Sequence, residues 1–303
     1  MITTEKPSSR ISRRLKTALC AAAALIAAVL LIYLVFPTAA PLPAPSEETV
    51  LPSPESTAAP AATPVPTAPP LSAGDSIYYP YDPALFATDS RGRITYAGEG
   101  YRSLTGIDVS EHQYDIDWSQ VAADGIDFAI IRTGYRGYTS GGLHEDKYFR
   151  QNIQGALEAG IPVGAYFFSQ AISAREAREE AAFVIDQLKD YEVTMPVVFD
   201  MEILSREYRT YGLSRRTLYK CTQAFCDAIA EAGYTPMIYM TQYLGYQKYT
   251  LRELADLYDF WFAEYYVSYP SFVYDFRMWQ YSDTGSVSGV SGNVDLDLYL
   301  LRE

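Results

Sequence analysis

Two carboxylic acids, Asp200 and Glu202, are separated by a single residue at the end of the apolar run Met195–Ile203, which is rich in β-branched side chains. Strand side chains alternate between faces, so these acids point the same way, with Cα atoms roughly 6–7 Å apart. Acidic side chains at the end of a buried strand must be paired with a positive charge, kept protonated or used in chemistry. Two acids held close separate their pKa values, so one keeps a proton while the other is ionised. Cleavage of a glycosidic bond requires such a pair, with one acid protonated and the other ionised.

A strand–helix alternation that begins at Gly106 must position these acids. It predicts an α/β fold, an irregular (β/α)-barrel of the TIM-like kind, whose last helices are shortened or missing because the later strands are closely spaced. The strand-like runs are Gly106–Ser110, Phe128–Thr133, Pro162–Ser169, Met195–Glu202, Thr235–Met240, Phe260–Tyr265, Arg277–Tyr281 and Val294–Tyr299. The helical patterns are Trp118–Ala123, Asp146–Ala159, Ser173–Lys189, Ser214–Ala232 and a short one over Leu251–Leu257.

In such barrels the chemistry takes place where the strands end, at the C-terminal face. Asp108 lies near the end of the first strand, and Asp200 and Glu202 end the fourth. Asp295 and Asp297 lie in the eighth strand, which neighbours the first in a closed barrel. We therefore expect acids that are distant in the sequence to converge on one mouth.

Aromatic and amide side chains at strand ends are candidates for binding a sugar, which has apolar faces and a rim of hydroxyl groups. They also fill barrel interiors, so a packing role is the alternative. Arg132 ends a strand, and we expect it to pair with one of the acids. The alternative for Glu202 is a structural salt bridge with Arg132 or Arg206. The candidate substrate-binding residues are Tyr166, Tyr265, Gln280, Trp279, Tyr239 and Arg132.

The N-terminal third differs in composition from the rest. The chain has a net charge of −13, yet its first 36 residues carry five basic side chains and one acidic one. The remainder is strongly acidic, which argues against a nucleic-acid partner. Residues 18–36 are apolar and long enough to cross a membrane, and the basic tail 1–17 would stay in the cytoplasm. We expect a single-pass anchor with the rest outside the cell; the alternative is a cleaved signal peptide.

Residues 37–72, rich in proline, alanine and threonine, predict an extended spacer. Residues 73–105 are rich in tyrosine and contain turn signals, so Arg93–Ala97 could be one strand of a hairpin. This extension either packs on the next domain, 106–303, or adds an aromatic surface for substrate. Cys221 and Cys226 lie five apart in a helical pattern, which is poor geometry for a bridge, so both should be buried thiols.

Seven motifs in order resemble the glycoside hydrolase family 25 lysozymes, the Chalaropsis-type muramidases, from Gly106 to the C-terminus. The resemblance implies an irregular barrel that cleaves the β-1,4 bond between N-acetylmuramic acid and N-acetylglucosamine in peptidoglycan. The motifs are Gly106-Ile-Asp-Val-Ser-Glu-His-Gln113 with Ile116-Asp-Trp118, Phe128-Ala-Ile-Ile-Arg-Thr133, Gly164-Ala-Tyr-Phe167, Val198-Phe-Asp-Met-Glu202, Phe260-Trp-Phe-Ala263 with Tyr265, Met278-Trp-Gln-Tyr281 and Val294-Asp-Leu-Asp297.

The resemblance also implies roles for the acids. Glu202 matches the proton donor, and Asp200 matches the acid that attacks the sugar or stabilises a substrate-derived oxazolinium; both mechanisms remain open. Asp108 and Asp295 match two further acidic positions, whereas Asp297 matches a variable one. No metal or cofactor is expected, because the acids supply both the proton and the charge.

Two other functions are compatible with parts of the sequence. A chitinase-like hydrolase would carry the longer series Asp-x-x-Asp-x-Asp-x-Glu, but the corresponding stretch here, Thr194–Val198, contains no acid. A non-catalytic scaffold that binds cell-wall glycan would have no need of Asp108, Asp200, Glu202 and Asp295 together. The sequence leaves protein partners and oligomeric state open.

Overall fold

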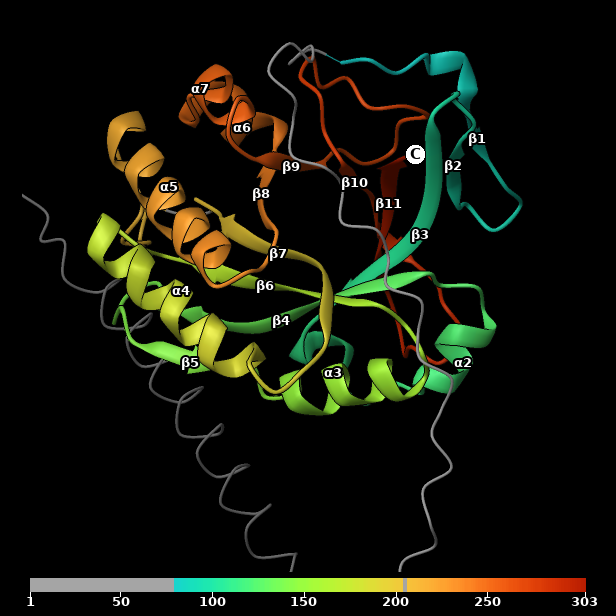
Figure 1. Ribbon diagram of the computed structural model, residues 1–303, viewed down its shortest axis with the longest axis horizontal. Coiled ribbons are helices and arrows are strands. Elements are labelled where there is room, and N and C mark those ends of the chain that lie inside the picture. Colours follow the sequence, from blue (N-terminus) through green and yellow to red (C-terminus); the bar gives the residue numbers. More distant parts are fainter. Residues whose placement is uncertain (1–78, 204–205) are drawn as a thin grey trace, which may run out of the picture. The chain divides into compact units, whose positions relative to one another are not determined.

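The computed structural model of the protein describes residues 79–203 and 206–303. Eight strands close into a barrel in the ring order β3-β11-β10-β9-β8-β7-β6-β4, and β4 pairs with β3 to complete the ring (Figure 1). The expected eight-stranded α/β barrel is thereby confirmed. The ring strands are β3 (Tyr101–Val109), β4 (Phe128–Arg136), β6 (Val163–Ser169), β7 (Val193–Met201), β8 (Pro236–Thr241), β9 (Asp259–Ala263), β10 (Met278–Gly285) and β11 (Val294–Arg302), and β5 (Leu143–Glu145) extends β4 outside the ring.

Strand β11 runs against the direction of the other ring strands. It is antiparallel to both β10 and β3, whereas the remaining neighbours are parallel. Residues 286–293 are too few for the crossover that a parallel return would need. The start of β11 therefore lies beside the end of β3, with Asp295 opposite Asp108. This reversal brings Asp295 to the same end of the barrel as the other acids.

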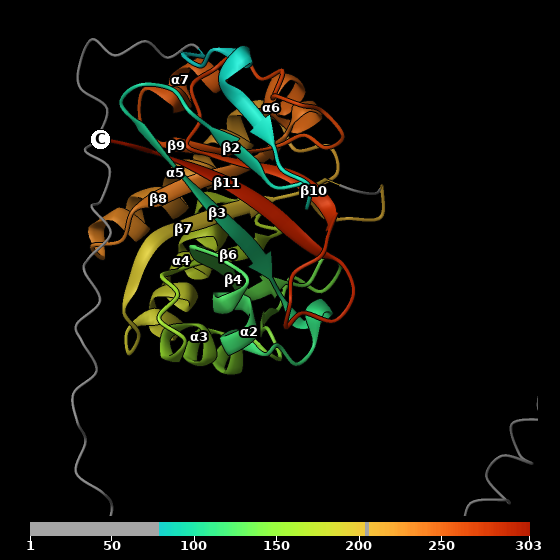
Figure 2. The same cartoon turned by 90° about the vertical axis from the view of Figure 1, so that its right-hand side faces the viewer.

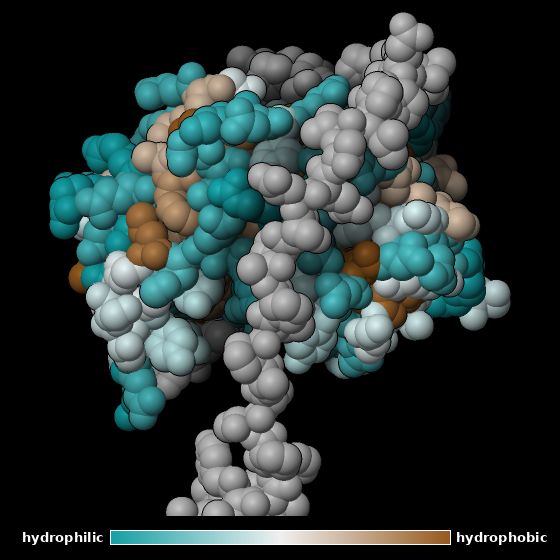
Figure 3. All heavy atoms as spheres, turned by 90° about the horizontal axis from the view of Figure 1, so that it is seen from below, coloured by the Kyte–Doolittle hydropathy of each residue, from teal (hydrophilic) through white to brown (hydrophobic). Residues whose placement is uncertain are grey.

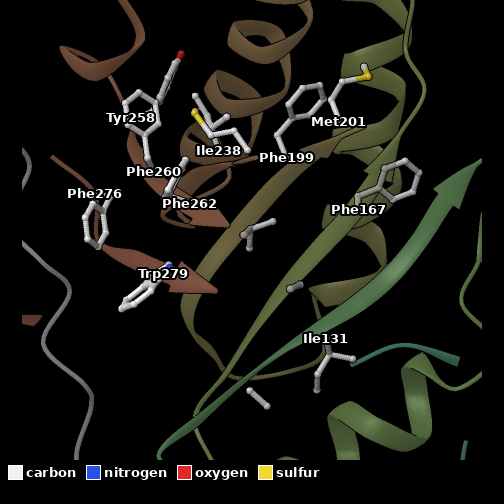
Figure 4. Packing of buried hydrophobic residues seen from close by; sticks show 14 of the residues in the cluster. Ile131, Phe167, Phe199, Met201, Ile238, Tyr258, Phe260, Phe262, Phe276 and Trp279 are labelled. Carbon is white, nitrogen blue, oxygen red and sulfur yellow. The ribbon is translucent and has the colours of Figure 1, made fainter. Parts of the chain in front are cut away.

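Helices cover the outer face of the first half of the barrel (Figure 1). Phe167, Phe199 and Ile238 belong to the apolar layer on this outer side of the strands (Figure 4). The helix α6 was not expected from the sequence, because its tyrosines, glutamine and glycine give no apolar periodicity. The helices are α2 (Trp118–Ala123), α3 (Phe149–Glu158), α4 (Ala174–Leu188), α5 (Arg215–Glu231), α6 (Gln242–Lys248) and α7 (Leu251–Ala255), with short 3₁₀ turns at Pro83–Leu85 and Glu111–Gln113. Cys221 and Cys226 are free and buried in α5, as expected.

The tyrosine-rich extension packs on the side of the barrel that has no long helices (Figure 2). Strands β1 (Phe86–Thr88) and β2 (Ile94–Tyr96) form an antiparallel hairpin. The ring of Phe86 meets the edge of Trp279 from β10, with centroids 5.9 Å apart, and Tyr81 lies 4.8 Å from Phe276. These contacts bury the outer face of β10, where a complete barrel of this class would place a helix.

The barrel interior is apolar in its N-terminal half and polar near its C-terminal end. Its apolar part includes Leu104, Phe128, Met195, Met237 and Met278. Gly106 faces this floor, and a Cβ added there would lie 2.2 Å from Cζ of Phe128. The absence of a side chain at residue 106 thus makes room for a phenylalanine ring beneath the acids.

We expect Gly106→Ala to lower the free energy of unfolding by about 1–3 kcal/mol, because the fully buried Phe128 ring must shift. Urea denaturation measures this. Gly142→Ala is the matched control, since its added Cβ would lie 3.4 Å from the nearest atom, Nε2 of His144. Equal midpoints for the two variants would contradict the argument.

The expected tail 1–17, membrane segment 18–36 and spacer 37–72 lie outside the described residues, as do residues 73–78 of the extension. Within 79–203 and 206–303, no helix is both long and apolar enough to cross a membrane. The face of the domain shown in Figure 3 carries mostly hydrophilic residues, with hydrophobic ones in small separate groups.

Candidate active site

Five acids gather at the C-terminal end of the barrel. Asp108 comes from β3, Asp200 from the end of β7, and Asp295 and Asp297 from β11, while Glu202 follows β7 by one residue. Asp108 and Asp200 are each 5% exposed and Asp297 is fully buried, whereas Glu202 and Asp295 are partly exposed. The expected convergence is thus present: two acids open toward solvent, and three lie beneath them.

Burial and nearby negative charges raise the pKa values of all five carboxyl groups. Burial, and then the charge of Glu202, raises the pKa of Asp200 well above its usual range, and Arg132 opposes this rise. Burial, and then Asp295, raises the pKa of Glu202. Burial, and then Asp283, raises the pKa of Asp295 to about 6. Such acids can keep a proton near neutral pH, as a general acid must.

Gln280 on β10 connects Asp108 to two tyrosines. The hydroxyl groups of Tyr239 and Tyr265 both donate to Oε1 of Gln280, at 3.0 and 2.6 Å. Nε2 of Gln280 then donates to Oδ2 of Asp108 at 2.6 Å. Because two hydroxyl groups occupy the amide oxygen, the amide nitrogen must face Asp108, which is held as an acceptor.

The backbone of Glu202 is fixed by Gln170, a residue that the sequence analysis missed. Nε2 of Gln170 donates to the carbonyl oxygen of Glu202 at 3.0 Å, and Thr210 donates to Oε1 of Gln170, also at 3.0 Å. Gln170 and Thr210 are both fully buried. The side-chain amide of Gln170, the residue after β6, thus connects Glu202 at the start of the following loop with Thr210 further along it. A polar residue directly after the buried strand β6 was the available signal.

Arg132 pairs with acids other than the five described above. Its Nε donates to Asp146 at 2.7 Å and its Nη2 to Glu111 at 3.0 Å. Arg206 lies over the ring of Tyr211, 5.9 Å from the centroid. The salt bridge considered for Glu202 is therefore not how these arginines are used. Arg132 still acts at the site, since its charge opposes the rise in the pKa of Asp200.

Tyr166, Tyr239 and Tyr265 face the barrel interior, together with Trp261, which the sequence analysis did not single out. The rings of Tyr239 and Trp261 lie 4.9 Å apart. Trp279 faces the opposite way: it is fully buried in the outer layer, and its indole donates to the carbonyl oxygen of Glu264 at 2.9 Å. This placement corrects our expectation that Trp279 contacts substrate. Adjacent strand residues point to opposite faces, so Trp279 and Gln280 could not both face the mouth.

Comparisons with known proteins agree with this geometry. The family model "Glycosyl hydrolases family 25" matches residues 107–290. The autolytic lysozyme of Clostridium acetobutylicum is 27% identical over 194 residues, which cover 64% of this chain and 55% of that protein. Lysozyme M1 of Streptomyces globisporus is 31% identical over 200 residues, 63% of this chain and 66% of that protein. The chain therefore matches less than two thirds of the length of either relative.

Solved structures share the fold. A bacterial lysozyme from Streptomyces coelicolor superposes with a TM-score of 0.53 at 30% identity, covering 65% of this chain and 91% of that one. The modular autolysin LytC of Streptococcus pneumoniae, solved with a synthetic peptidoglycan ligand, has a TM-score of 0.59 at 23% identity, covering 74% and 52%. The second likeness supports the fold alone.

Proposed function

The chain belongs to the glycosyl hydrolases of family 25, and we propose that it is a muramidase, cleaving the β-1,4 bond between N-acetylmuramic acid and N-acetylglucosamine in peptidoglycan. The observation that carries this proposal is the convergence of Asp108, Asp200, Glu202 and Asp295 at one end of the barrel. The names of two similar proteins, both lysozymes, support the choice of substrate.

Glu202 is the general acid in this proposal. It is the partly exposed member of the β7 pair, and its raised pKa keeps a proton available for the leaving oxygen. After the bond breaks, the Glu202 carboxylate takes a proton from the attacking water. Asp200 acts in its ionised form, which the charge of Arg132 favours by opposing the rise in its pKa. It either attacks the anomeric carbon or stabilises an oxazolinium formed from the acetamido group of the substrate.

The side chains around the acids have separate tasks. Tyr166 and Tyr265 are partly exposed aromatic residues at the mouth, and we propose that their rings contact the sugar. Gln280, which accepts a hydrogen bond from Tyr239, donates to Asp108 and so fixes its position. Arg132 contributes positive charge near Asp200.

Product analysis tests the bond assignment. Purified peptidoglycan is incubated with the protein, the fragments are reduced with borohydride, and mass spectrometry identifies the reduced sugar. Fragments reduced at muramic acid would establish a muramidase. Fragments reduced at glucosamine would mean that a glycosidase cleaves the other bond. Absence of fragments, with wall binding intact, would favour a glycan-binding scaffold.

We propose further, from the sequence alone, that residues 18–36 anchor the protein in the cell membrane and that the barrel lies outside. The spacer 37–72 would then hold the barrel away from the membrane. Protease treatment of intact protoplasts tests the orientation. We expect loss of the barrel and a protected N-terminal fragment; a fully protected chain would contradict this topology.

The charge of Asp295 gives a prediction for pH dependence. Burial, and then Asp295, raises the pKa of Glu202, so Asp295→Asn removes one cause of the rise. The Glu202 proton is then lost at lower pH, and the alkaline limb of the kcat profile moves to lower pH. The residual kcat of Asp295→Asn, measured from pH 4 to 9 beside the wild type, shows where this limb lies. An unmoved limb would mean that Asp295 does not tune Glu202.

A further inference from the structure

Asp297 is the most deeply buried acid at the mouth, and the proposed mechanism gives it no task. Its side chain is fully inaccessible to solvent. Its Oδ1 accepts a hydrogen bond from the indole Nε1 of Trp261 at 2.9 Å. Its Oδ2 is also buried and has no hydrogen-bond donor among the described residues. A buried carboxylate oxygen without a donor is unfavourable, so it requires an explanation.

The explanation lies on the neighbouring strand. Asp297 is opposite Gly106 in the β3–β11 pairing, and Asp108 lies two residues further along β3 on the same face. This register brings the two carboxyl groups together, and a hydrogen bond with Asp108 lowers the pKa of Asp297, against the rise that burial causes. Two carboxyl groups can hydrogen-bond only if one of them carries a proton.

The charges around the pair favour a single proton within it. Two acids interact with Asp297: Asp108 on β3 and Asp295 on its own strand. The phenol of Tyr281 on β10 also interacts with it. Its remaining neighbour, Trp261 of β9, is neutral. None of these groups is a cation, so a second negative charge would be buried without compensation. Consistently, burial, and then Asp295, raises the pKa of Asp297 well above its usual range.

We propose that Asp297 is a positioning residue that shares one proton with Asp108, so that the pair holds a single negative charge. Oδ2 of Asp108 accepts from Gln280, and the shared proton links the Asp108 carboxyl group to Asp297. Through Gln280 this arrangement also orients Tyr239 and Tyr265. Its relevance to catalysis rests on the proposed function.

The substitution Asp297→Asn tests the proton. An asparagine amide has the same shape, can donate permanently to Asp108 and can still accept from Trp261. The folded wild type keeps a proton that the unfolded chain releases, so its stability falls as pH rises above the usual pKa of an aspartate. The asparagine variant lacks this loss. We therefore expect the stability difference, variant minus wild type, to grow between pH 4 and pH 8 with a slope of about one proton.

Urea denaturation of the full-length chain, in detergent, gives this difference at each pH. Asp190→Asn, a change at an exposed carboxylate, is the matched control and should show no such slope. A difference for Asp297→Asn that is independent of pH would overturn the proposal. Asp297→Leu, which can neither donate nor accept a hydrogen bond, should lower turnover at pH 7 more than Asp297→Asn does.

A second measurement needs no folded variant. Carbon-13 NMR of wild-type protein, with the aspartate carboxyl signals assigned, should show a protonated carboxyl at Asp297 or Asp108 at pH 7, and its absence from both residues would also overturn the proposal. Neither the stability difference nor the NMR signal requires turnover. If peptidoglycan were not cleaved, the proposed function would fail while the shared proton could still be observed.

Discussion

Glu202→Gln is expected to lower kcat on purified peptidoglycan by about 10²- to 10⁴-fold, because glutamine cannot protonate the leaving oxygen. The side chain keeps its length and its partly exposed position. Gln170 holds the backbone carbonyl of residue 202, which the substitution does not alter, so the fold should persist. Binding to the wall should remain, since an amide still forms hydrogen bonds with a sugar.

Released muropeptides, counted after reduction, measure this loss. Glu158→Gln is the matched control, because Glu158 is an exposed carboxylate at the end of α3, away from the mouth. Near-normal turnover of Glu202→Gln would remove Glu202 from the role of general acid. Wall binding without turnover in the wild type as well would instead indicate a scaffold.

The barrel could be predicted because its strands are short apolar runs, most of them with β-branched or aromatic residues, and the spacing between runs sets where helices fit. The reversal of β11 was not predicted, although the short connection before Val294 contained that information. Its consequence is specific: Asp295 reaches the mouth from the start of its strand rather than from the end. Helix α6 was missed because its apolar face is narrow, with Leu244 and Gly245 buried.

The side chains that face the mouth were predicted correctly where strand alternation was applied and incorrectly where it was not. Asp200 and Glu202, two residues apart, share a face, as do Asp295 and Asp297. Trp279 and Gln280 are adjacent, so only one of them could line the interior, and it is Gln280. Gln170 acts through the backbone of Glu202; its place after β6 could have marked it as a candidate, but not which backbone group it contacts. Such partners depend on loop conformation, which the sequence does not specify locally.

Asp200→Asn is expected to lower kcat by about 10²-fold or more, because it removes the negative charge closest in the chain to the general acid. Asp200 is 5% exposed, and its Oδ1 has no hydrogen-bond partner among the described residues. An oxygen kept free in this way can approach the anomeric carbon or the oxazolinium. The asparagine has the same volume, so the loss reports charge and nucleophilicity rather than packing. Asp190→Asn, at an exposed site after α4, serves as the control.

The smaller variant Asp200→Ala distinguishes the two mechanisms left open. If Asp200 attacks the sugar, removing its carboxyl leaves a space in which added azide can act as the nucleophile, and a glycosyl azide should form. If the acetamido group of the substrate attacks, Asp200 supplies only charge, and azide should not restore turnover. In that case a substrate lacking the N-acetyl group should be cleaved poorly by the wild type. Turnover of Asp200→Asn equal to that of the control would exclude both roles, since each requires a carboxylate at residue 200.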